Sequence, residues 1–150
     1  MQEVPLYSEI FDGLWMGGTD DFDSVNRSVK LPILSEVSEF QAVVTLSAYS
    51  QPFGWYVSEY RYCIPDAPLD PIHAVELERV ADWAHSQWNS GKQTLIRCQA
   101  GMNRSGLVTA MILMRNGSTA DSAIKLIRKK RHPDALSNSS YAAYLHGELS

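Results

Sequence analysis

The sequence has few cysteines and no long apolar run. Only 2 of its 150 residues are cysteines, Cys63 and Cys98, which is too few for a disulfide-rich secreted module. The longest apolar stretch, near residues 106–114, is too short to cross a bilayer, and the start of the chain lacks the basic and apolar segments of a secretory signal. We therefore expect a soluble, cytoplasmic protein without a membrane partner, whose thiols are free.

The sequence also lacks an excess of positive charge. Its 17 acidic residues outnumber its 13 lysines and arginines, and the formal net charge is -4. Binding to nucleic acids in general, or to an anionic membrane, requires a basic face. We therefore do not expect a nucleic-acid partner, and the function must be found in a local site.

The apolar residues that are present predict one α/β domain over residues 1–150, with a core from about 8 to 148. No repeat or linker interrupts the chain, and its composition is that of a globular protein. Short apolar segments predict strands, and segments with helical spacing predict helices. The strands are expected near 14–16, 42–46, 60–64 and 94–97, and the helices near 20–40, 71–90, 107–115, 119–131 and 138–149. This order favours a central, mostly parallel sheet flanked by helices.

One helix has clear start and face signals. Asp70 and Pro71 supply an N-cap and a first helical residue. Helical spacing predicts that Ile72, Val75 and Val80 share its buried face with Trp83, Ala84 and Trp88.

The strongest chemical signal is the loop from Cys98 to Ser105, between a predicted strand and a predicted helix. The N–H groups at the start of a helix form a ready anion site, into which a tetrahedral phosphate fits. A cysteine among such donors and beside Arg104 is expected to be a thiolate at neutral pH, and therefore a nucleophile.

Each residue of this loop has a chemical reason for its place. Arg104 offers a planar fork of donors to two phosphoryl oxygens. The Ser105 hydroxyl can stabilise the sulfur when it leaves, and Gly101 allows a tight turn close to the ligand. The residues expected to bind the phosphate with their backbone are Gln99, Ala100, Gly101, Met102 and Asn103.

The segment Cys98-Gln99-Ala100-Gly101-Met102-Asn103-Arg104-Ser105-Gly106 resembles the signature loop of the protein tyrosine phosphatase superfamily, specifically that of the compact, atypical dual-specificity phosphatases. Residues 11–18 resemble the opening strand pair of that family. Residues 131–138 resemble the segment that buttresses its signature loop, which makes Asn138 a candidate support residue. The resemblance implies the dual-specificity phosphatase fold.

The chain departs from the family at Arg97, since the family usually has histidine just before the nucleophile. The Arg97 guanidinium could lower the thiol pKa by its charge, but the hydrogen bonds of the family histidine cannot be assumed. Arg97 is therefore a second candidate support residue.

A phosphatase of this type also needs an acid to protonate the leaving oxygen. Asp66 and Asp70 are the candidates upstream of Cys98. The N-cap position explains Asp70 without catalysis. In the family that this chain resembles, the acid lies about thirty residues before the nucleophile, where Asp66 falls, so Asp66 is the preferred candidate.

These residues predict a cysteine-dependent hydrolase of phosphate monoesters that needs neither metal nor cofactor. The expected substrates are a phosphorylated protein, on tyrosine and also on serine or threonine, or a small aryl phosphate, with phosphate, sulfate or vanadate as ligands of the loop. Asn103 beside Arg104 also resembles the loop of RNA 5′-triphosphatases, which remains an alternative. A non-catalytic phosphate-recognition module is the other.

Two further features have simple structural interpretations. Cys63 is predicted to be a buried strand thiol, with a redox partner of Cys98 as the alternative. The run Arg128 to Arg131 is predicted to be a solvated helix end whose charges complement the helix dipole.

Overall fold

The protein is described from a computed structural model that covers residues 4–19, 40–48, 50, 52 and 57–148. The prediction of a helix near 20–40 lies outside the described residues, except for residue 40, which is in neither a helix nor a strand. The strands are β1 (Tyr7–Phe11), β2 (Leu14–Gly17), β3 (Ala42–Thr45), β4 (Ser58–Arg61) and β5 (Thr94–Arg97). The described helices are α2 (Pro71–Asn89), α3 (Arg104–Arg115), α4 (Ala120–Lys130) and α5 (Ser139–Leu145).

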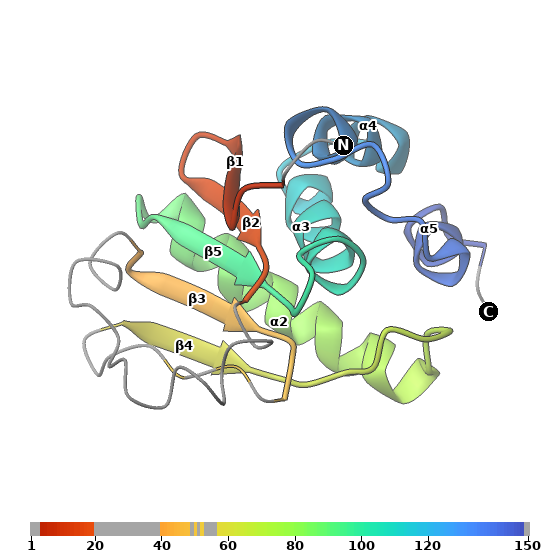
Figure 1. The fold of residues 1–150 in the computed structure, drawn as a ribbon, viewed down its shortest axis with the longest axis horizontal. Helices are drawn as coiled ribbons and strands as arrows, with labels where there is room; N and C mark the ends of the chain where they lie inside the picture. Colours follow the sequence, from red (N-terminus) through yellow and green to blue (C-terminus); the bar gives the residue numbers. More distant parts are fainter. Residues whose placement is uncertain (1–3, 20–39, 49, 51, 53–56, 149–150) are drawn as a thin grey trace.

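The strands form one sheet in the order β1-β2-β5-β3-β4 (Figure 1). β1 pairs antiparallel with β2, and every other pair is parallel. The predicted α/β architecture with a mostly parallel sheet is thereby confirmed. The register pairs Arg97 with both Gly17 and Thr45, and Thr45 with Arg61, so that β2, β5, β3 and β4 end at the same edge. Ligands of open α/β sheets bind outside this carboxyl edge.

The larger core cluster joins the sheet to the described helices. It contains inward-facing residues of β1, β2, β3 and β5 together with residues of α2, α3, α4 and α5. α3 is its centre, because every residue from Ser105 to Leu113 is buried. A rigid helix therefore begins directly outside the carboxyl end of β5, at the predicted phosphate loop.

Several predicted boundaries need correction. The strand predicted at 60–64 ends at Arg61, and the helix predicted from 107 begins at Arg104. The last helix ends at Leu145 instead of 149. These ends depend on backbone hydrogen bonds that local apolar patterns do not specify.

The predicted face of α2 is also partly wrong. Asp70 caps the helix as predicted, with its carboxylate accepting a hydrogen bond from the Ile72 N–H at 2.8 Å. However, Ile72 and Val75 are 75% and 62% exposed, although Val80 is buried. The buried face is made of smaller residues and one leucine: Ala74, Leu77, Val80, Ala81 and Ala84. Close packing against α3 and the sheet selects these alanines, which a hydropathy pattern does not rank highly.

Candidate active site

The sulfur of Cys98 lies between the end of β5 and the start of α3. Cys98 follows the last residue of β5 and is 2% exposed. Its Sγ accepts a hydrogen bond from the Ser105 N–H at 3.3 Å and lies 3.4 Å from the Ser105 hydroxyl oxygen. The Ser105 N–H and the positive, N-terminal end of α3 thus face this sulfur.

The backbone of the loop is arranged to bind an anion. Its carbonyl oxygens, from Gln99 to Asn103, accept hydrogen bonds from Thr19 N, Arg131 Nη2, Arg131 Nε, Leu136 N and Leu107 N in that order. Among the residues that the structure describes, no acceptor pairs with the N–H groups from Gln99 to Arg104. With the carbonyl groups bonded outward, these donors remain for a ligand, as in other phosphate-binding loops.

Gly101 allows the loop to pack against the end of β2. Its φ is +72°, and a Cβ there would lie 2.6 Å from Gly18 N and 2.7 Å from Arg131 Nη2. The Cys98 N–H also donates to the Gly17 oxygen at 3.2 Å. The predicted tight turn is therefore present, and it fixes the loop against the opening strand pair.

The Arg104 guanidinium lies at the same end of α3. Its Nη1 donates to the Ile64 carbonyl oxygen at 3.0 Å. No carboxylate lies within ion-pair distance of it in the described part of the chain. Its charge is therefore not neutralised by these neighbours and is available to an anion.

The structure brings Asp66, but not Asp70, to the signature loop. Asp66 accepts a hydrogen bond from Asn103 Nδ2 and another from Asn138 Nδ2, each at 3.0 Å. Asp70 caps α2 instead. The three side chains that the sequence assigned separately, Asp66, Asn103 and Asn138, thus form one cluster beside Arg104.

α5 holds the backbone around Asp66. The Tyr141 hydroxyl donates to the Pro65 oxygen at 2.9 Å, and Asn138 Nδ2 also donates to the Ala67 oxygen at 3.0 Å. Burial raises the pKa of Tyr141 to about 12, and the nearby charge of Asp66 adds to this increase. The segment that carries the candidate acid is thus fixed in place by a neighbouring helix.

Arg97 does not lie with the other site residues. Its Nε donates to Thr45 Oγ1 at 2.9 Å, and its Nη2 is 3.5 Å from the Glu59 carboxylate. Burial lowers the pKa of Arg97, and the charge of Glu59 opposes this effect. Since side chains alternate along β5, Arg97 lies on the face of Leu95, opposite to Ile96 and Cys98. These contacts direct its guanidinium to β3 and β4 instead of the sulfur.

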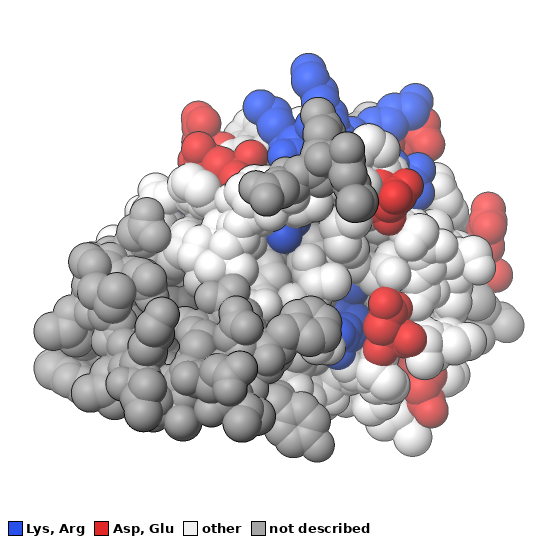
Figure 2. Space-filling model, in the orientation of Figure 1, with Lys and Arg blue, Asp and Glu red and all other residues white. Residues whose placement is uncertain are grey.

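Arg131 supports the loop in a way that the sequence analysis missed. Figure 2 shows basic side chains over α4, and Arg128 to Lys130 are exposed as predicted, but Arg131 is only 7% exposed. Its Nε donates to the Gly101 oxygen at 3.0 Å, and its Nη1 donates to Ser8 Oγ at 3.0 Å and to the Pro5 oxygen. Burial lowers the pKa of Arg131, and the charge of Cys98 opposes this effect. The resemblance of residues 131–138 to a buttress segment was the signal that could have identified it.

The prediction for Cys63 is wrong in its structural part. β4 ends before Cys63, and the residue is exposed, so it is not a buried strand thiol. Both cysteines are free thiols.

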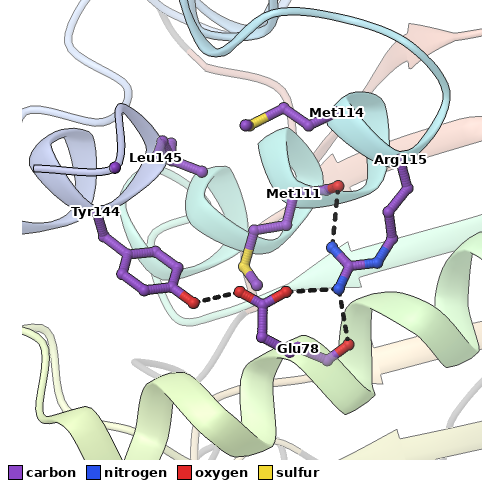
Figure 3. A pocket seen from close by; sticks show the side chains of 7 residues that line it. Glu78, Met111, Met114, Arg115, Tyr144 and Leu145 are labelled. Atoms are coloured by element: carbon purple, nitrogen blue, oxygen red, sulfur yellow. Dashed lines mark hydrogen bonds and ion pairs between the residues drawn. The ribbon is translucent and has the colours of Figure 1, made fainter. Parts of the chain in front are cut away.

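A pocket lies away from this site, between α2, α3 and α5 (Figure 3). Its volume is about 550 Å³, and its apolar lining includes Met111, Met114 and Leu145. The Glu78 carboxylate accepts hydrogen bonds from Arg115 Nη2 at 2.5 Å and from the Tyr144 hydroxyl. The polar groups of the pocket are therefore paired with one another. Its lining does not combine a nucleophile with an acid.

Comparison with known proteins assigns the chain to a family. The family model described as dual specificity phosphatase, catalytic domain, matches residues 27–147. The chain therefore belongs to the dual specificity phosphatases and is a cysteine-based protein phosphatase. A search of curated protein sequences gives no significant match. Among the described residues, no helix is long and apolar enough to cross a membrane.

Solved structures show the same fold at low sequence identity. A mouse protein described as a dual specificity phosphatase, complexed with zinc tungstate, is 20% identical with a TM-score of 0.73, over 99% of this chain and 91% of that one. Tk-PTP in its active form is 22% identical with a TM-score of 0.71, over 97% and 99%. Human DUSP28 is 19% identical with a TM-score of 0.72, over 95% and 94%.

Proposed function

We propose that this chain is a single catalytic domain that hydrolyses phosphate monoesters, on phosphotyrosine and also on phosphoserine and phosphothreonine, through a cysteinyl-phosphate intermediate. The observation that carries the proposal is the pair of contacts from Ser105 to the Cys98 sulfur, 3.3 Å from the N–H and 3.4 Å from the hydroxyl. These contacts support a thiolate at the bottom of a ring of backbone donors.

In the first step, the Cys98 sulfur attacks phosphorus while Asp66 gives its proton to the leaving oxygen. The S–P bond forms as the ester P–O bond breaks. Arg104 and the N–H groups from Gln99 to Arg104 hold the phosphoryl oxygens, where negative charge is redistributed in the transition state.

In the second step, the Asp66 carboxylate takes a proton from water as the water oxygen attacks phosphorus. The P–S bond breaks, and the Ser105 hydroxyl donates a hydrogen bond to the departing thiolate. Neither step calls for a metal ion or a cofactor.

The loop composition favours phosphoproteins or small aryl phosphates over phosphoinositides. Residues 99–103 contain no lysine or arginine that could bind additional phosphates. Inorganic phosphate, sulfate and vanadate are the simple anions expected in the loop. A reducing compartment such as the cytoplasm suits a mechanism that depends on a thiolate.

The test is hydrolysis of an aryl phosphate across pH, with a chelator present, by the wild-type protein, Cys98→Ser and Asp66→Asn. We expect wild-type turnover that survives chelation and is lost in Cys98→Ser. We also expect Asp66→Asn to lose the high-pH limb, which reports the protonated acid. Turnover by Cys98→Ser would contradict the mechanism. Vanadate binding by an inactive wild-type protein would favour the recognition module.

The residue Asn103 gives one specific reason to test RNA 5′-triphosphatase activity, since this residue type precedes the loop arginine in those enzymes. The contact of Asn103 with Asp66 at 3.0 Å instead ties it to the candidate acid, which supports ester hydrolysis. Release of phosphate from a 5′-triphosphorylated RNA faster than from an aryl phosphate would favour the alternative.

A further inference from the structure

The cluster of Asn103, Asp66 and Asn138, called here the amide clamp, gives each oxygen of the Asp66 carboxylate its own donor. Asn103 Nδ2 donates to Oδ2 and Asn138 Nδ2 donates to Oδ1, both at 3.0 Å. The clamp therefore fixes the position of Asp66 through both of its oxygens.

The orientation of the Asn103 amide is set by groups on its other side. Its Oδ1 accepts a hydrogen bond from the Asn138 N–H at 3.0 Å and another from Ser137 Oγ at 3.4 Å. A flipped amide would place its nitrogen against the Asn138 N–H and its oxygen against the carboxylate. The NH₂ group of Asn103 must therefore face Asp66.

The Asn103 side chain does not cap the helix that it precedes. Asn103 is the N-cap of α3, where an asparagine side chain commonly accepts a hydrogen bond from the first turn. Here its side chain makes no capping bond, and the residue has helical φ and ψ of −93° and −59°. The side chain is directed to the candidate acid and not to its own helix.

We propose that Asn103 is a positioning residue for the general acid, which fixes the Asp66 carboxyl group relative to the phosphate loop so that it can protonate the leaving oxygen. The inference rests on the proposed function and adds to it. Asn103 belongs to the signature loop and directly precedes Arg104, so one short segment holds both the phosphoryl group and its acid. The benefit is greatest for leaving groups that need the proton most.

The first experiment compares the wild-type protein with Asn103→Ala on a series of substituted phenyl phosphates. We expect Asn103→Ala to lower kcat by about 10- to 100-fold for the most basic phenol and by less than about threefold for the most acidic phenol. Ser137→Ala is the matched control, because it removes only the longer contact to Asn103 Oδ1, and the Asn138 N–H still holds the amide with its NH₂ group facing Asp66. An equal loss for all phenols in Asn103→Ala would overturn the proposal.

The isosteric variant Asn103→Asp separates positioning from structural support. It keeps an acceptor for the Asn138 N–H, but it replaces the donor with an oxygen next to the carboxylate of Asp66. Like charges at this distance favour protonation, so we expect the high-pH limb of the rate profile to move to higher pH. An unchanged pH–rate profile together with wild-type activity would show that the Asn103 NH₂ group is not needed.

A double-mutant cycle distinguishes this proposal from the proposed function. In an Asp66→Asn background, Asn103→Ala is expected to cause no further loss with basic phenols. A full additional loss would show that Asn103 acts other than through Asp66. If Asp66→Asn alone left the leaving-group dependence unchanged, the assignment of the acid itself would be wrong. Circular dichroism and thermal unfolding of each variant show whether a loss of rate follows from a loss of fold.

Discussion

Helix α3 has an arginine at each end, and the two arginines have opposite surroundings. Arg104, at the start, donates to a backbone oxygen and has no carboxylate within ion-pair distance among the described residues. Arg115, at the end, lies 2.5 Å from the carboxylates of both Glu78 and Asp82. Burial lowers the pKa of Arg115, but the hydrogen bonds to Asp82 and Glu78 outweigh it and raise the pKa overall.

The different surroundings of Arg104 and Arg115 indicate that the two charges have different roles. A cation is favourable at the negative, C-terminal end of a helix and unfavourable at the N-terminal end. Arg115 is therefore explained by stability alone. Arg104 is placed where stability disfavours it, and an anion bound in the loop, as the proposed function requires, would account for its position.

The largest effect is expected from Arg104→Lys, because lysine cannot offer a planar fork to two phosphoryl oxygens. We expect kcat/KM for an aryl phosphate to fall by about 100- to 1,000-fold. Arg115→Lys is the matched control at the other end of α3 and should leave kcat/KM unchanged within about twofold. Equal losses in both variants would contradict the contrast.

Arg131→Met is expected to destabilise the signature loop from behind. It removes the donors from the buried Gly101 oxygen and from Ser8, and the free energy of unfolding should fall by about 3 kcal/mol. Vanadate affinity should fall as well, because the loop loses its support. Urea unfolding and a vanadate titration measure the two effects. Lys129→Met, on the exposed side of α4, should change neither.

Tyr141→Phe should affect the acid segment, whereas Tyr144→Phe should affect only the pocket. Loss of the hydroxyl leaves the Pro65 oxygen without its donor and should cost about 1–2 kcal/mol, with a reduced kcat. Tyr144→Phe should leave kcat unchanged. Unfolding followed by fluorescence and steady-state kinetics test the pair, and a normal kcat in Tyr141→Phe would argue against support of Asp66 by α5.

The same tyrosines predict a loss of stability at alkaline pH. Burial raises the pKa of both Tyr141 and Tyr144 from 10.0 to about 12, with Asp66 and Glu78 as the respective further causes. Their stabilising effect is therefore fully present below pH 10 and is lost as the pH rises towards 12. Unfolding free energies measured across this range should decline less steeply in either phenylalanine variant.

The smallest effect on stability is expected from a substitution of Thr109, which lies between the two ends of α3. Thr109 is fully buried, and its hydroxyl has no hydrogen-bond partner among the residues that the structure describes. Thr109→Val replaces it with a group of similar shape and should raise the free energy of unfolding by about 1 kcal/mol. Activity should not change. Destabilisation in this variant would indicate that the hydroxyl has a partner, such as a buried water.

The parts of the fold that were predicted correctly depend on local signals. Thr94–Arg97 is a short apolar strand, and Asp70-Pro71 is a standard helix start, so both were predicted at the right residues. The face of α2 was predicted less well. Ile72 and Val75 are more hydrophobic than Ala74 and Ala81, but the face of α2 that is buried in the fold is the one that carries the alanines, together with Leu77 and Val80.

The candidate site shows the same difference between features with local sequence signals and features that depend on tertiary packing. The order Cys98, Gly101, Arg104 and Ser105 identified the loop because its chemistry is contained in one short segment. The burial of Arg131 and the direction of Arg97 were not predicted, since both depend on which distant strand or loop lies next to each guanidinium.

The sequence by itself determined the family and supplied the candidate nucleophile and the candidate anion-binding loop, because each of these is carried by neighbouring residues. Only the tertiary structure decided that Asp66, Asn103 and Asn138 meet, since they belong to three separate segments that become adjacent after the sheet and helices pack. In the described part of the chain, the tertiary structure places no carboxylate within ion-pair distance of Arg104, but it places Glu78 and Asp82 next to Arg115. Charge pairing depends on distances across the fold, and these distances are absent from a linear pattern of residue types.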